Sequence, residues 1–249
     1  MPLYALSALS VMNEPATIVT KVAAGDEELL AGFRSPGADL HWRPARSTAT
    51  FRLDHDGERR ELVIDDVGDG FTASEIDGWV RTAVSDCAGV HLGALSRADF
   101  PASAPVSLTA DRLVSVDGQG LARPGRIGPV VRDPAYDPQG LDGVDVLKLS
   151  TGEATALGLE LTQPALRSLG VPEVIVTLGS EGALVSTADE LTQLRAQPVA
   201  NVDPTGSGDR FAAAYLTSRL RDHSPLEAAH AAVSISTQAL RQQLDPAES

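Results

Sequence analysis

Two glycines enclose a serine directly before an aspartate at residues 206–209, and a helix-forming run follows at 211–220. A helix that begins here directs its unpaired N–H groups, and the positive end of its dipole, toward any ligand that approaches the small residues. Asp209 lies in the first turn, where a carboxylate can take a proton from a hydroxyl while the N–H groups hold phosphoryl oxygens. On the residues alone, an ordinary helix start with an acid that favours the dipole remains an equal alternative.

Composition narrows the classes of function. The chain has 249 residues, with 20 Lys and Arg against 34 Asp and Glu, which gives a net charge of −14. This charge repels polyphosphate backbones, and no basic stripe with interleaved aromatics is present, so nucleic acid is not an expected partner. The apolar runs are too short to cross a bilayer, and no secretory signal opens the sequence. We therefore expect a cytoplasmic protein with no membrane association.

Several enzyme classes are excluded by their missing motifs. Only two lysines occur, Lys21 and Lys148, and neither follows the glycine of a Walker motif, which excludes a P-loop ATPase. The HRD and DFG motifs of protein kinases and the HExxH motif of zinc proteases are absent as well. The single Cys87 excludes an intrachain disulfide framework.

The elements that must position residues 206–209 follow a strand–helix rhythm. Short apolar runs, each ending at a polar or glycine-containing turn, are typical of strands buried on both faces of a doubly wound, mostly parallel sheet. Ligands bind such sheets at the carboxyl ends of the strands. We expect one α/β domain over residues 1–249, with long helices at 211–220 and 224–244. The predicted strands lie at 17–22, 90–92, 113–116, 144–147 and 174–177.

A β-hairpin interrupts this rhythm. Residues 48–53 alternate in polarity, Asp-His-Asp-Gly forms a turn at 54–57, and apolar residues return at 62–64. The segment around 40–65 is therefore predicted to be a small projecting sheet that acts as a lid or as the clasp of a homodimer. Its arginines are candidates for contact with a substrate, although a solvated strand face is the favoured interpretation. These arginines are Arg52, Arg59 and Arg60.

The run Asp-Pro-Thr-Gly-Ser-Gly-Asp at 203–209 closely resembles the carboxy-terminal signature of the PfkB/ribokinase family of carbohydrate and nucleoside kinases. Three further segments resemble family elements in the same order: 116–123 is similar to a D-x-Q-G-x-x-R run, 148–153 to the N-x-x-E element with serine in place of asparagine, and 176–183 to a nucleotide-binding hairpin. The resemblance covers essentially the whole chain and implies a ribokinase-like fold.

The resemblance also implies a reaction and its residues. It implies an ATP-dependent phosphotransferase that moves the γ-phosphoryl group to a hydroxyl of a small sugar, cyclitol or nucleoside, with Asp209 as the general base. It implies an anion hole at the first turn of the helix, and Mg²⁺ organised through water by Glu153, which on the residues alone could equally be a helix-start acid. The implied anion-hole residues are Gly206, Ser207 and Gly208, and the implied donor-binding residues are Lys148, Ser150, Thr177, Gly179 and Gly182.

Two sets of ligands follow from the same resemblance. Asp203 and Thr205 match positions that bind a monovalent cation in some members of the family. For the acceptor, the candidates at the end of one predicted strand are Asp117, Gln119 and Arg123.

The amino terminus departs from the family pattern. Family members begin with a strand that ends in an acidic ligand and continue into a Gly-Gly-x-x-x-N element, whereas residues 2–9 here look like the helix that normally follows it. Three explanations remain open: an internal start, an acceptor pocket built from other residues, or a degenerate kinase-like fold. The alternative function is accordingly a catalytically impaired nucleotide-binding or regulatory protein. A kinase of hydroxymethyl groups on vitamin-like rings is a third possibility.

Overall fold

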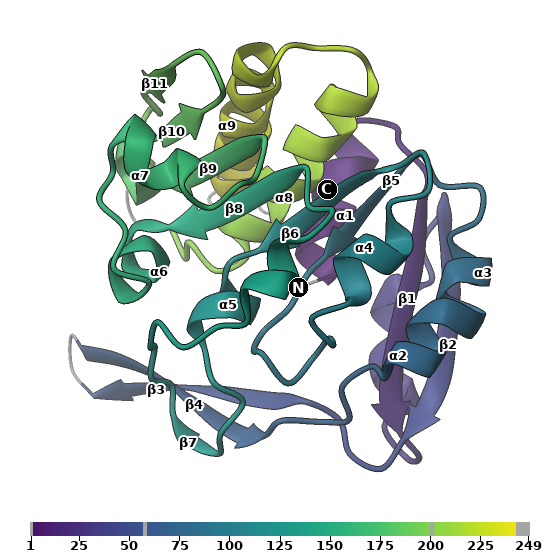
Figure 1. Ribbon diagram of the computed structural model, residues 1–249. Coiled ribbons are helices and arrows are strands. Elements are labelled where there is room, and N and C mark those ends of the chain that lie inside the picture. The colour runs from purple at the N-terminus through teal and green to yellow at the C-terminus, as the bar shows by residue number, and fades with distance from the viewer. Residues whose placement is uncertain (1, 57–58, 200–201, 243–249) are drawn as a thin grey trace.

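Six strands form the central sheet of this computed structural model, which describes residues 2–56, 59–199 and 202–242 (Figure 1). The strand order is β11-β10-β9-β8-β6-β5, with β5, β6, β8 and β9 parallel and β10 and β11 antiparallel to their neighbours. The predicted mostly parallel α/β sheet is confirmed. Four of the five predicted strands lie in it, whereas the strand predicted at 17–22 lies in a separate two-stranded sheet. The strands are β5 (Gly89–Leu92), β6 (Leu113–Asp117), β8 (Val146–Ser150), β9 (Glu173–Thr177), β10 (Ala183–Ser186) and β11 (Leu191–Leu194).

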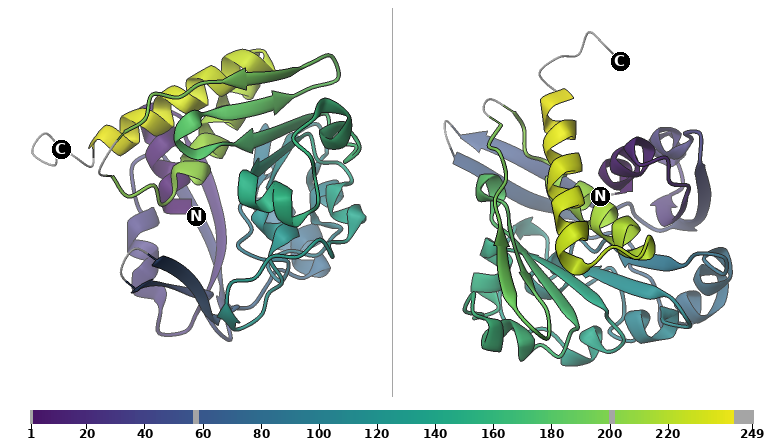
Figure 2. Two further views of the ribbon diagram at one scale, coloured as in Figure 1. Left: turned by 90° about the vertical axis from the view of Figure 1, so that its left-hand side faces the viewer. Right: turned by 90° about the horizontal axis from the view of Figure 1, so that it is seen from above.

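Three helices gather on one face of this sheet: α1 (Pro2–Val11), α8 (Ser207–Leu220) and α9 (Pro225–Gln242) (Figure 2). Apolar residues of α8 and α9 pack there against β8, β9, β10 and β11. Both predicted long helices are confirmed. The second begins with the predicted capping box, in which the Glu227 backbone N–H donates to Ser224 Oγ and the Ser224 N–H donates to Glu227 Oε2.

Shorter helices cover the opposite face, where leucines and valines of four parallel strands form the larger apolar cluster. This face holds no side chain that the sequence analysis assigns to catalysis. The elements on this side and in the connections are α2 (Ala73–Glu75), η2 (Ile76–Val80), α3 (Arg81–Ala83), α4 (Ala104–Leu108), α5 (Gln119–Ala122), η3 (Pro138–Leu141), α6 (Thr151–Ala156), α7 (Gln163–Arg167) and η4 (Gly179–Glu181).

A second, two-stranded parallel sheet lies beside the central one and joins β1 (Ala16–Ala23) to β2 (Ala38–Ala45). A 3₁₀ helix, η1 (Glu27–Phe33), connects the two strands. Strand β2 is not predicted by the sequence, because its charged residues and Pro44 break the apolar run that marks the other strands.

The predicted hairpin is confirmed as β3 (Thr50–Asp56) and β4 (Arg59–Asp66), and β7 (Gly128–Pro129) adds a third antiparallel strand. We call these three strands the hairpin sheet. It lies below α5 and α6, which follow the carboxyl ends of β6 and β8 (Figure 1). Arg52 forms an ion pair with Asp65 across the hairpin, while the side chains of Arg59 and Arg60 lie outside the described residues.

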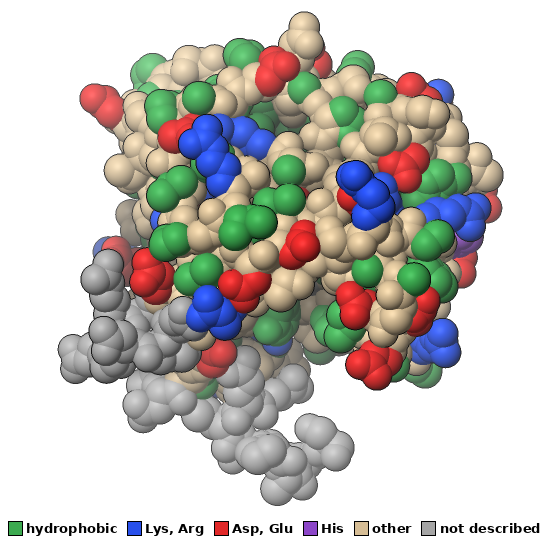
Figure 3. Space-filling view, turned by 90° about the horizontal axis from the view of Figure 1, so that it is seen from below, with side chains coloured by type: hydrophobic (Ala, Val, Ile, Leu, Met, Phe, Trp, Pro, Cys, Tyr) green, Lys and Arg blue, Asp and Glu red, His purple; other side chains and the backbone are tan. Residues whose placement is uncertain are grey.

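The outer surface carries charges of both signs. On the face seen from below, positive and negative side chains are interspersed (Figure 3). Within the described ranges, no helix has both the length and the apolar character needed to span a membrane.

Candidate active site

The first turn of α8 carries the predicted anion-binding residues. Gly206 caps the helix with a φ of 77°, and a β-carbon on it would lie 2.0 Å from Cγ of Tyr4, so only glycine fits this position. The Ser207 N–H donates to the Pro204 carbonyl, whereas the Gly208 N–H belongs to the first turn, whose N–H groups have no acceptor within the helix. The helix therefore offers an anion site with its positive end.

Asp209 lies in this same turn and is only 7% exposed. Burial raises the pKa of its carboxyl to about 6, helped by the nearby Asp117 carboxylate, while the cations Lys148 and Arg210 act in the opposite direction. A carboxylate whose pKa lies close to neutral is suited to accept a proton from a hydroxyl.

A buried ion pair joins the ends of two neighbouring strands next to α8. Asp117 and Lys148 are register partners on β6 and β8, and Lys148 Nζ donates to Asp117 Oδ2 over 3.1 Å. Burial disfavours the charged form of Lys148, but the Asp117 and Glu153 carboxylates outweigh it, and the pKa of Lys148 is raised. A β-carbon on Gly208 would lie 2.7 Å from Lys148 Nζ, which places the ammonium group against the first turn of α8.

Glu153 and Ser150 form a capping box at the start of α6. The Ser150 N–H donates to Glu153 Oε2 over 2.8 Å, and the Glu153 N–H donates to Ser150 Oγ over 3.3 Å. Glu153 is buried, and its Oε1 lies 3.6 Å from an Nη atom of Arg123. The helix-start role that the sequence offers for Glu153 is confirmed, and its Oε1 retains acceptor capacity.

The three acceptor candidates are linked into the same network. The Gln119 N–H donates to Asp117 Oδ1, and Arg123 donates from Nη1 to Gln119 Oε1 over 2.9 Å. Arg123 is buried, and its Nε has no hydrogen-bond partner among the described residues. Burial lowers the pKa of Arg123, and Arg132 acts in the same direction. The structure thus brings Asp117, Gln119 and Arg123 together with Lys148 and Glu153.

The predicted donor residues on β9 and the following turn lie at the same edge of the sheet. Thr177 is the register partner of Ser150, and its hydroxyl donates to the Leu149 carbonyl. Gly179 has a φ of 61° and open space around the position of a β-carbon. Gly182 differs, because a β-carbon there would lie 2.0 Å from the Leu194 carbonyl oxygen. Packing against β11 therefore accounts for glycine at this position without a ligand.

The loop that precedes α8 contains the cation candidates. Asp203 Oδ1 accepts hydrogen bonds from the backbone N–H and the hydroxyl of Thr205, and the Thr205 carbonyl accepts from Arg210 Nη1. Across the described segments, no group of three or more His, Cys, Asp or Glu side chains is arranged to hold a metal ion. The chain therefore presents single carboxylates here rather than a cage of protein ligands.

Three residues that the sequence does not single out, Arg210, Tyr4 and Ser7, complete this side of α8. Arg210 lies over the ring of Tyr4, 4.9 Å from its centroid, and its Nε donates to Ser7 Oγ. These contacts attach the start of α1 to the start of α8. Sequence alone gives no signal for them, because the partners are about 200 positions apart.

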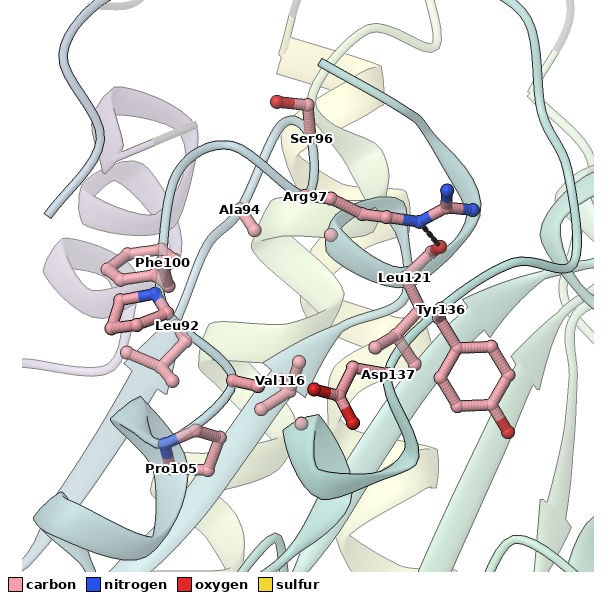
Figure 4. Close-up of a pocket in the computed structure, with 14 residues that line it drawn as sticks. Leu92, Ala94, Ser96, Arg97, Phe100, Pro105, Val116, Leu121, Tyr136 and Asp137 are labelled. Carbon is pink, nitrogen blue, oxygen red and sulfur yellow. Dashed lines mark hydrogen bonds between the residues drawn. The ribbon is translucent and has the colours of Figure 1, made fainter. Parts of the chain in front are cut away.

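Two cavities lie away from these residues. The first, of about 280 Å³, is lined by residues such as Leu92, Phe100 and Tyr136 on the face opposite α8 (Figure 4). The second, of about 600 Å³, runs along β2 and contains Trp42 and Trp79. None of the predicted site residues lines either cavity, so the candidate site is the polar network at the strand ends.

Comparisons with known proteins agree with this arrangement. A family model described as "pfkB family carbohydrate kinase" matches residues 121–245. A fructokinase from Rhizobium leguminosarum bv. trifolii is 30% identical over 170 residues, which cover 65% of this chain. The chain spans about half of that relative, 51% of its length.

Solved structures show the same fold. A pyrophosphate-dependent kinase in the ribokinase family, complexed with a pyrophosphate analog and myo-inositol, superposes with a TM-score of 0.81 at 20% identity and covers 96% of this chain and 85% of its own. Arabidopsis thaliana ribokinase, complexed with ribose and ATP, gives a TM-score of 0.69 at 18% identity, with coverages of 96% and 80%.

Proposed function

Because the chain belongs to the PfkB family of carbohydrate kinases, we propose that it transfers the γ-phosphoryl group of ATP to a hydroxyl of a sugar, a cyclitol or a nucleoside. The observation that carries this proposal is the position of Asp209, a buried carboxylate with a raised pKa in the glycine-lined first turn of α8. A protein that only binds nucleotides has no need of a base at this position.

In the proposed reaction, Asp209 accepts the proton of the acceptor hydroxyl as its oxygen attacks the γ-phosphorus. A new oxygen–phosphorus bond forms, the bond from the γ-phosphorus to the β–γ bridging oxygen breaks, and ADP leaves. The N–H groups of Gly206 and Gly208 at the first turn of α8 stabilise charge on the transferring group, while the Ser207 N–H stays on the Pro204 carbonyl. Catalysis is then mostly positioning and electrostatic stabilisation, as phosphoryl transfer requires.

For Mg²⁺, the residues fit a site that is completed mainly by the donor and by water. Glu153 supplies a hard oxygen acceptor, because its Oε1 faces Arg123 only at 3.6 Å, and Mg²⁺ commonly keeps several waters. We infer that Glu153 holds the ion through water, and that the bound ion would neutralise charge on the donor phosphates. Arg210 already donates a hydrogen bond to the Thr205 carbonyl, so the proposed reaction includes no monovalent cation at Asp203 and Thr205.

The proposal also assigns the residues that bind ATP, the phosphoryl donor, and those that bind the substrate that accepts the phosphoryl group. Ser150, Thr177 and Gly179 lie at adjoining strand ends and would contact the phosphates and ribose of ATP. Gln119 is half-buried, while Asp117 and Arg123 are buried, so Gln119 is the member of that group best placed to meet an acceptor. The hairpin sheet would cover the acceptor as a lid; a homodimer clasp is the alternative.

The test is a panel of donors and acceptors with wild type and Asp209→Asn. ATP and pyrophosphate, each with Mg²⁺, are offered with fructose, ribose, myo-inositol and adenosine, and formation of the phosphorylated product is followed. Acceptor-dependent product with ATP that disappears in Asp209→Asn supports the proposal. If product forms with pyrophosphate but not with ATP, the phosphoryl donor is pyrophosphate and not ATP. ATP binding without product on any acceptor would instead establish the catalytically impaired alternative.

A further inference from the structure

Under α8, the central sheet carries a row of polar side chains where an apolar face is expected. His91, Ser115, Asp117 and Lys148 occupy register-related positions on β5, β6 and β8, on the same face as Val146 of the α8 cluster. His91 Nδ1 lies 3.1 Å from Ser115 Oγ. Burial lowers the pKa of His91 to about 4, with the Lys148 charge acting in the same direction. His91 is therefore neutral, and the charges of this row are those of Asp117 and Lys148.

Lys148 is a buried cation that faces the amino terminus of a helix. The residue is 3% exposed, and its ammonium group lies against Gly208 in the first turn of α8, at the positive end of the helix dipole. Burial of a lysine is costly unless its charge is compensated. Asp117, which is 0% exposed, supplies one negative charge from the sheet side. Packing alone does not require this ion pair, because two apolar side chains would fill the same volume.

The hydrogen bonds of Lys148 are also incomplete. An ammonium group has three N–H donors, and within the described part of the chain Lys148 donates only to Asp117 Oδ2. The remaining donors lie beside the N–H groups of the α8 first turn. An anion bound at this turn would meet the helix N–H groups and Lys148 together, and would reverse the repulsion between the lysine and the helix end.

We propose that Lys148 binds the phosphoryl group in transit at the first turn of α8, and that Asp117 is a positioning residue that holds the ammonium group there rather than a ligand of the acceptor. This inference rests on the proposed function. Lys148 keeps its proton throughout: it donates to a non-bridging oxygen of the phosphoryl group, while the acceptor proton goes to Asp209. Charge that develops on the transferring group is thereby compensated in a buried site.

A variant that removes both charges gives the cleanest test. Lys148→Met alone leaves the buried Asp117 carboxylate without its counter-charge, which threatens folding. The double variant Asp117→Asn/Lys148→Met removes the pair and leaves no buried charge unpaired. The matched control is Lys21→Met. Lys21 is the chain's other lysine and is also largely buried, and it forms a 3.1 Å ion pair with Glu75 at a site remote from α8. Thermal unfolding of all three proteins checks that assays are made on folded chains.

Two readouts separate binding of the transferring group from a structural role. We expect kcat of the double variant to fall by about 100-fold or more, as on loss of an oxyanion donor, with the acceptor KM changed by less than about threefold, while Lys21→Met keeps kcat. Calorimetry with inorganic pyrophosphate should show Kd raised by at least about tenfold in the double variant, as for the loss of a charge-assisted hydrogen bond.

The outcomes also distinguish this inference from the proposed function. Wild-type turnover together with a double variant that retains kcat and pyrophosphate affinity would overturn the role of Lys148 and leave the kinase intact. Absence of turnover in wild type, with pyrophosphate affinity lost in the double variant, would refute the kinase and still support Lys148 as an anion ligand. Absence of both turnover and pyrophosphate binding in wild type would refute both.

Discussion

The two faces of the central sheet are built from the same four parallel strands but differ in chemistry. Toward α4 and α7, β5, β6, β8 and β9 present leucines and valines, and the cavity there is lined mostly by apolar side chains. Toward α8, two of these strands, β6 and β8, carry Asp117 and Lys148 at the carboxyl edge. Successive side chains of a strand point to opposite faces of the sheet. The two faces therefore differ because the residues of each strand that point toward α8 differ from those that point away from it.

The comparison shows why the apolar cavity on the α4 face is not the candidate site. A cavity lined by apolar residues can be filled or left empty with little electrostatic consequence, whereas buried charges are costly unless they are paired or meet a ligand. The α8 face concentrates such charges at the strand ends, where ligands bind in open α/β sheets. Changes on the α8 face should therefore alter turnover, and changes on the α4 face should alter stability at most.

The largest effect is expected for Asp209→Asn. The variant keeps shape but cannot accept the acceptor proton, so kcat should fall by about 10³-fold, within the range for a positioned base, while calorimetry should show nearly unchanged ATP binding. The control is Glu227→Gln, which removes an acid from the start of α9, where it caps the helix. If the kcat of Asp209→Asn were within tenfold of the wild-type value, the active site would not be on the α8 face.

A smaller effect is expected for Gly206→Ala. Its positive φ and the 2.0 Å approach of a β-carbon to Tyr4 Cγ require the loop to move, so we expect a loss of stability of about 1–3 kcal/mol together with a clear loss of kcat. Gly158→Ala is the matched control, since Gly158 has a φ of 71° but no neighbour within 4 Å of a β-carbon. Equal losses of kcat in the two variants would show that strain alone, not the α8 turn, is responsible.

The smallest effect is expected on the opposite face. Ala102→Val adds two methyl groups to a residue that lines the 280 Å³ cavity, and it should change the free energy of unfolding by no more than about 1 kcal/mol with kcat within twofold of wild type. Chemical denaturation and steady-state kinetics measure both. A loss of kcat above tenfold with a folded protein would show that the two faces are coupled, contrary to the comparison.

Much of the fold was predictable, because its signals are local. Short apolar runs gave the parallel strands, and the Ser224–Glu227 capping box gave the start of α9. Strand β2 was missed because its outward residues and Pro44 hide the apolar alternation. Helix α8 begins at Ser207, so the sequence also placed Asp209 at a helix amino terminus.

The site was less predictable, because its contacts join distant segments. The Asp117–Lys148 pair spans 31 positions and depends on the register of β6 and β8. The contact of Arg210 with Tyr4 joins the two ends of the chain. A sequence can nominate Asp117 as a polar residue at a strand end, but only the strand pairing shows that its partner is a lysine.

The central claim, that Asp209 is the base, is tested most directly by the pH dependence of kcat/KM. Among the described residues, the charged groups that act on Asp209 are Asp117 from β6, Lys148 from β8 and Arg210 from α8, and burial is the main reason that its pKa is raised to about 6. The active form is the carboxylate, so kcat/KM should fall as the pH is lowered through about 6, and this limb should be absent from the residual activity of Asp209→Asn. Full wild-type kcat/KM at pH 4.5, with the protein still folded, would contradict the account.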